Sequence, residues 1–139
     1  MVEPKVIVYC TDFSSQADAA FEAARALAAK WHARLLVLNM VSSGDELFGS
    51  GIETWMTFRD RTLAMLQERY VSGAGVDVEA FVRKGAPGVG IIDFVKEQRA
   101  DMVVVGSRGA GSVAGFLGGG SVTDKVIKNS PVPVLVVPA

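Results

Sequence analysis

Apolar residues occur along this chain in five short runs, and the segments between the runs show helical periodicity. The runs cover residues 5–10, 33–41, 76–82, 102–105 and 134–137. Four of them are predominantly apolar, which predicts buried strands. The run from Val76 to Val82 instead alternates apolar and polar positions, so we expect this strand to lie nearer the edge of a sheet.

The intervening segments predict four helices. Ser14 and Ser15, with Asp18 three residues after Ser15, form a helix-start pattern, and Pro87 is placed to open another helix. The predicted helices run from Ser15 to Trp31, from Ile52 to Val71, from Pro87 to Gln98 and from Val122 to Asn129. Strands and helices therefore alternate from one end of the chain to the other.

This alternation predicts an α/β fold: a single-domain, open, five-stranded parallel sheet with helices on both faces, joined by right-handed crossovers. We expect residues 1–139 to form one domain, because no internal repeat and no linker divides them. At 50% hydrophobic and 21% charged residues the composition is that of a globular protein.

Charge and cysteine content exclude several classes of function. The formal net charge is −1 with no basic stripe, so we expect neither nucleic acid nor membrane as a partner. One cysteine, Cys10, and one histidine, His32, exclude an intrachain disulfide and a His/Cys metal cage. Glu3 and Pro4 interrupt any secretory signal, and together these features predict a cytoplasmic protein.

The strongest chemical signal is a glycine-rich segment after the fourth strand. Seven glycines lie between Gly106 and Ser121, directly before the last predicted helix. Glycine brings main-chain N–H groups close to a ligand, and a helix N-terminus attracts anions. Ser121 and Thr123 add hydroxyl groups there. The pattern favours a polyphosphate site, and its alternative is a glycine-rich loop without a ligand.

Two known phosphate motifs fit this segment poorly. Gly109, Gly111 and Ala114 have the spacing of a dinucleotide fingerprint, but they follow the fourth strand and no acidic residue stands about 20 positions later. Gly115 and Gly120 have the spacing of a P-loop, but Ser121 stands where that loop needs lysine. We therefore expect neither a dinucleotide enzyme nor a P-loop kinase.

Four stretches of the chain carry a family resemblance: VIVYCTDFS at the front, the turn at Gly85, VVVGSRG in the middle and SPVPVLVVP at the end. In these stretches and in their order the chain resembles the universal stress protein family, in its ATP-binding branch. Two departures stand out. Ten residues separate Gly109 from Gly120 where the family has nine, so that either Gly120 or Gly119 takes the third glycine's place. Cys10 stands where the family commonly has proline.

The resemblance implies a Rossmann-like fold, similar to that of the adenine nucleotide alpha hydrolases, and a set of ATP-binding residues. Asp12, with Thr11 beside it, would meet the ribose or adenine side, and Val41 would line the adenine pocket. The ribose and phosphates would be held by Gly106, Arg108 and Gly109, and the phosphate tail by Gly120, Ser121, Val122 and Thr123. Mg²⁺ would accompany the phosphates, and no metal site of the protein's own is expected.

The resemblance favours an ATP-binding regulatory protein of the stress response that senses the nucleotide as a homodimer. The last strand, Val134 to Val137, is flanked by prolines and would pair with its copy. The alternative is a slow Mg²⁺-dependent ATPase or phosphotransferase using the same site. Phosphoryl transfer needs a group that positions the nucleophile, and no strong base is evident in the sequence, so we expect at most weak hydrolysis.

Overall fold

The computed structural model describes residues 3–42, 54–107 and 121–138. Within these residues the strands are β1 (Val6–Cys10), β2 (Arg34–Val41), β3 (Val78–Lys84), β4 (Met102–Gly106) and β5 (Val134–Val137). The helices are α1 (Ser15–Trp31), α2 (Trp55–Leu66), α3 (Pro87–Glu97) and α4 (Ser121–Asn129), and α2 continues into a π-helical segment, Gln67–Val71.

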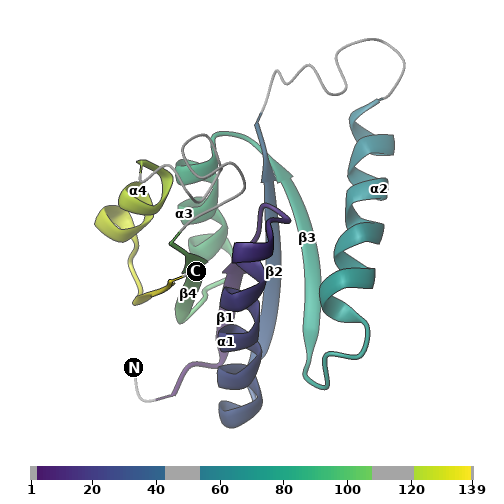
Figure 1. The fold of residues 1–139 in the computed structure, drawn as a ribbon. Coiled ribbons are helices and arrows are strands. Elements are labelled where there is room, and N and C mark those ends of the chain that lie inside the picture. Colours follow the sequence, from purple (N-terminus) through teal and green to yellow (C-terminus); the bar gives the residue numbers. More distant parts are fainter. Residues whose placement is uncertain (1–2, 43–53, 108–120, 139) are drawn as a thin grey trace.

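All five strands are parallel and form one sheet in the order β3-β2-β1-β4-β5. Helices α1 and α2 cover one face of the sheet, and α3 and α4 cover the other (Figure 1). The predicted α/β fold is therefore confirmed. The alternating run at Val76 to Val82 becomes β3, which lies at one edge of the sheet as its pattern predicts.

Alternate residues of the central strands supply two separate cores. Ile7 and Tyr9 of β1 point to the face covered by α1 and α2, where they meet small alanine side chains of α1. Val8 and Cys10 point to the opposite face, against α3 and α4. This period of two explains why β1 is apolar throughout, because both of its faces are buried.

The ends of the helices follow local chemistry. Ser14 is the N-cap of α1: its hydroxyl accepts a hydrogen bond of 3.1 Å from the N–H of Ala17. Asp18, three residues after Ser15, lies in the first turn of α1, and its carboxylate accepts hydrogen bonds from side chains of the π-helical segment. Pro87 stands at the first position of α3, as predicted.

Candidate functional site

The strand order of the sheet reverses between β1 and β4. The chain leaves β1 for α1 on one face, and it leaves β4 for α4 on the opposite face. In open α/β sheets, ligands bind in the crevice outside the carboxyl ends of the strands at such a switch point. The register pairs Tyr9 with Val104, so the residues that follow Cys10 lie beside Gly106 at the end of β4.

A tight turn, Thr11–Ser14, follows β1 at this point. The N–H of Phe13 donates to the hydroxyl oxygen of Thr11 at 2.9 Å, and the N–H of Ser14 donates to Oδ1 of Asp12 at 3.0 Å. Phe13 has a φ of 67°, in the left-handed region that a bulky residue rarely adopts. The side chains of the turn thus hold its backbone in a single, partly strained conformation.

Asn39 anchors the same turn from β2. It is 8% exposed, and its Nδ2 donates to the carbonyl oxygen of Thr11 at 2.9 Å. The N–H of Thr11 in turn donates to the carbonyl of Leu38 at 3.0 Å. Asn39 was not among the predicted site residues, although an amide within an apolar strand was a readable signal, because a buried polar group needs a partner.

Strand β2 extends beyond the end of β1 and forms one side of the crevice. Cys10 pairs with Leu38, and β2 then continues to Val41, about 10 Å further at the usual rise per residue. Val41 is buried, and its carbonyl accepts a hydrogen bond of 2.8 Å from the N–H of Gly85. Gly85 has a φ of 150°, a conformation for which glycine is suited.

The other side of the crevice is where the phosphates are expected. Gly106 ends β4, and α4 begins at Ser121, with Val122 half-buried and Thr123 buried. Asp124 in the first turn of α4 already provides one negative charge for the helix dipole. The predicted site residues Arg108, Gly109 and Gly120 lie outside the described residues, as does most of the glycine-rich segment.

The structure thus places Thr11, Asp12, Val41 and Gly106 at the carboxyl ends of the strands, as expected from their positions at or just after strand ends. Thr11 is fully buried, and its hydroxyl is engaged within the protein, so its side chain supports the turn. The ligand contacts assigned to these residues stay predictions.

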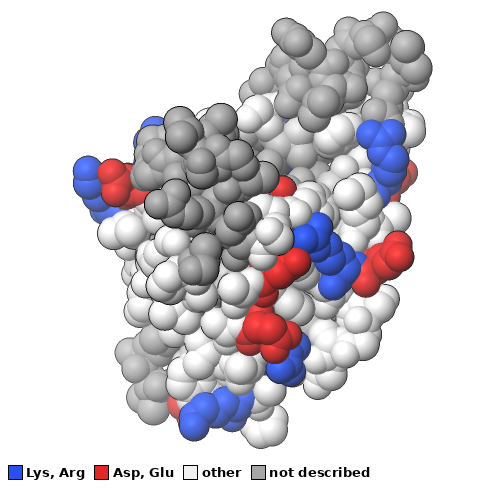
Figure 2. All heavy atoms as spheres, in the orientation of Figure 1, with Lys and Arg blue, Asp and Glu red and all other residues white. Residues whose placement is uncertain are grey.

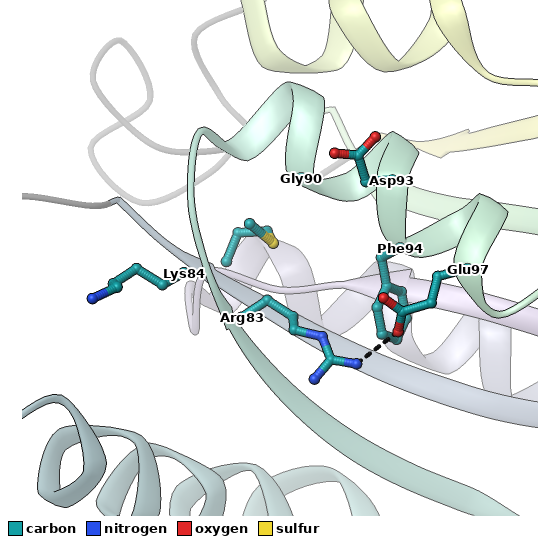
Figure 3. Close-up of a pocket in the computed structure, with 7 residues that line it drawn as sticks. Arg83, Lys84, Gly90, Asp93, Phe94 and Glu97 are labelled. Carbon is teal, nitrogen blue, oxygen red and sulfur yellow. Dashed lines mark hydrogen bonds and ion pairs between the residues drawn. The ribbon is translucent and has the colours of Figure 1, made fainter.

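A cavity of about 150 Å³ lies on the α3 face, beside the ends of β2 and β3 (Figure 3). Arg83 lines it, and its guanidinium pairs with Glu97 at 2.8 Å and stacks against Phe81 and Phe94. A hydrogen bond from Gln98 and the pairing with Arg83 lower the pKa of Glu97. The charge of Arg83 is therefore already neutralised.

Other chemistry is sparse in the described residues. Cys10 is fully buried, which raises the pKa of its thiol and makes it unreactive. Within the ranges 3–42, 54–107 and 121–138, no three His, Cys, Asp or Glu side chains form a group that could hold a metal ion. In the same ranges no helix is both long and apolar enough to cross a membrane.

The fold and its crevice place the chain in the doubly wound, Rossmann-like class of α/β proteins. The chain belongs to the universal stress protein family, whose model matches residues 3–138. A universal stress protein of Thermus aquaticus is 32% identical over 135 residues, which cover 96% of this chain and 98% of the relative. Universal stress protein Sll1654 of Synechocystis is 31% identical over 137 residues, covering 96% of this chain and 85% of the relative.

Solved structures agree with this assignment. UspA from Lactobacillus plantarum has the same fold, with a TM-score of 0.78 at 21% identity over 99% of both chains. A universal stress protein solved in complex with cAMP has a TM-score of 0.69 at 26% identity, over 97% of both chains. The family resemblance drawn from the four sequence stretches is therefore confirmed.

Proposed function

We propose that this chain is an ATP-binding regulatory protein of the stress response. The observation that carries the proposal is the turn Thr11–Ser14, which presents Asp12 where the strand order reverses, beside the end of β4. A relative that is 26% identical over nearly its whole length has been solved with cAMP, which shares the adenosine part of ATP.

In this proposal each element of the crevice holds one part of the nucleotide. Asp12 binds the ribose or adenine side, with Thr11 behind it, and Val41 lines the adenine pocket. Gly106, Arg108 and Gly109 hold the ribose and phosphates. The phosphate tail lies at the start of α4, on Gly120, Ser121, Val122 and Thr123. The N-terminal end of α4 and its helix dipole favour the anion, and Mg²⁺ would enter with the phosphates.

Titration calorimetry with Mg²⁺-ATP tests the proposal through Asp12→Asn. The amide keeps an oxygen acceptor for the N–H of Ser14 but removes the charge, so the turn is retained. A lost charged hydrogen bond is worth about 1.5–3 kcal/mol, so we expect the affinity to fall about 10- to 100-fold.

Asp101→Asn is a matched control at the opposite end of the sheet. Asp101 also accepts backbone N–H groups through one carboxylate oxygen, from Lys5 at 2.8 Å and Val6 at 3.0 Å. This variant should bind ATP like the unmodified protein. Equal affinity for ATP in both variants, or no binding of adenine nucleotide by the unmodified protein, would contradict the proposal. Phosphate release from Mg²⁺-ATP distinguishes a binding module from an ATPase.

We further infer that the protein acts as a homodimer through β5. This strand lies at an edge of the sheet, and the carbonyls of Pro133 and Val137 accept hydrogen bonds from the N–H groups of Val103 and Ser107. By the period of two, the N–H of Val136 points outward, where a second copy would pair. Val136→Pro should therefore give monomers in light scattering, and an unchanged mass would contradict this interface.

Because the chain has a single cysteine, we expect it to work in the cytoplasm.

A further inference from the structure

A chain of hydrogen bonds runs from the proposed nucleotide turn to the end of α2. The hydroxyl of Tyr70 lies 2.8 Å from Oγ1 of Thr11 and 3.0 Å from Oδ1 of Asp18. Arg69 then pairs with Oδ2 of Asp18 at 2.9 Å. Thr11 and Tyr70 are both buried, whereas the side chains of Asp18 and Arg69 lie at the surface. Figure 2 shows acidic and basic side chains next to one another over α1 and α2.

The chemistry of the four side chains decides which group donates in each of these hydrogen bonds. A carboxylate only accepts, so Tyr70 donates its single proton to Asp18. The bond between Thr11 and Tyr70 must then be donated by Thr11. The oxygen of Thr11 can still accept from the N–H of Phe13, which is the bond that shapes the turn. Removing the hydroxyl of Tyr70 therefore takes an acceptor away from the buried hydroxyl of Thr11.

Contacts with Phe13 strengthen the same connection. The ring of Phe13 lies 6.4 Å from that of Tyr70, and the guanidinium of Arg69 stacks over both rings at 5.9 and 5.5 Å. A left-handed backbone at a bulky residue persists only where its surroundings hold it, and such strain gathers at functional sites. Tyr70 lies in the π-helical segment, a rare conformation that is also frequent at functional sites.

From these contacts we propose that Tyr70 is a positioning residue for the adenine nucleotide, acting through Thr11 on the turn that presents Asp12. The inference rests on the proposed nucleotide binding and adds a part of the molecule outside the crevice to it. Asp18 and Arg69 hold Tyr70 in place. By reciprocity, a nucleotide bound at the turn stabilises the π-helical segment.

The test is the dissociation constant for Mg²⁺-ATP of the full chain, by calorimetry, in Tyr70→Phe. This variant keeps the ring and removes the hydroxyl, and we expect the dissociation constant to rise about three- to tenfold. Thr62→Val is the matched control: Thr62, in α2, also carries a buried hydroxyl, but it donates to the carbonyl of Phe58 within its own helix. Its dissociation constant should stay unchanged while its melting temperature falls.

A double variant separates positioning from general stability. If Tyr70 acts through Thr11, Tyr70→Phe raises the dissociation constant little further in a Thr11→Val background. Should Tyr70→Phe fail to fold, Asp18→Asn tests the same hydrogen bonds from the half-exposed side of the network. This variant weakens the bond that holds Tyr70, and it should raise the dissociation constant about twofold or more.

The outcomes distinguish this inference from the proposed function. ATP binding by the unmodified protein, with unchanged affinity in Tyr70→Phe, would overturn the positioning role and leave the nucleotide site standing. The positioning role would also be overturned if Tyr70→Phe raised the dissociation constant as much in the Thr11→Val background as it does in the unmodified protein. No ATP binding by the unmodified protein would overturn the proposed function, and this inference with it.

Discussion

Gly90 of α3 lies against Met40 of β2. Replacing Gly90 by alanine tests how tightly the core between the sheet and α3 is packed. A Cβ at Gly90 would overlap the terminal methyl group of Met40 and lie 2.9 Å from its sulfur. Carbon atoms in contact are about 3.5–4.0 Å apart, so the methyl group would have to retreat by more than about 1 Å. Met40 is 8% exposed and lines the cavity of about 150 Å³ beside Arg83, so its methyl group can retreat only by turning into that cavity.

The magnitude follows from two opposing effects. Alanine in place of glycine within a helix stabilises by about 0.5–1 kcal/mol, whereas overpacking a core costs about 1–3 kcal/mol. We therefore expect Gly90→Ala to lower the free energy of unfolding by about 0.5–2 kcal/mol. Gly88→Ala on the same helix is the matched control. Its Cβ would meet Cδ of Lys125 at 2.6 Å and Cβ of Lys125 at 3.2 Å. The end of this exposed side chain can turn away and the Cβ contact needs only a small shift of the helix, which offsets the gain from alanine, so we expect a change within about 0.5 kcal/mol of zero.

Urea unfolding of a double-mutant cycle is the assay. Met40→Ala alone should destabilise by about 2–5 kcal/mol, because it leaves a cavity. In that background the methyl group added at position 90 has space, so Gly90→Ala should become stabilising by about 0.5–1 kcal/mol. A change of sign between the two backgrounds is the predicted result. An equal loss in both would refute the packing contact, because the cost of alanine would then come from another source.

Three further predictions concern single groups. Native protein should not react with iodoacetamide at neutral pH and should react once unfolded, because burial raises the pKa of the Cys10 thiol; rapid alkylation of the native protein would contradict its burial. Ser14→Ala should lower the free energy of unfolding by about 1 kcal/mol in urea titrations, because the N–H of Ala17 loses its cap, and Ser14→Asp should restore most of it. Burial also raises the pKa of Tyr9 and Tyr70 above the ordinary 10.0, so the unfolded chain loses these protons first and stability should fall as the pH rises above about 10; a decline that is the same in Tyr70→Phe would argue against the contribution of Tyr70.

Much of the fold could be predicted because short-range signals agree with the tertiary structure. The apolar run at Val134 to Val137 is β5 residue for residue, and Pro87 begins α3. Thr62, Leu66 and Tyr70, which recur at helical spacing in residues 52–71, are buried in the structure. These signals depend on period and on capping chemistry, which act within a few residues.

The supports of the candidate site could not be predicted, since they depend on contacts between distant residues. Nothing local indicates that Tyr70 bonds Thr11, 59 positions away, or that Asp18 in the first turn of α1 pairs with Arg69. The helical period also does not reveal that α2 widens into a π-helix after Leu66. These groups meet because α1 and α2 pack on the same face of the sheet, and that packing depends on contacts between distant residues.

A crystal structure of the protein grown with millimolar Mg²⁺-ATP tests the central claim most directly. We predict adenine density beside Val41, the ribose at Asp12 and the phosphates at the first turn of α4. Density for the nucleotide elsewhere, such as the small cavity beside Arg83, or an empty crevice between the ends of β1 and β4, would contradict the account.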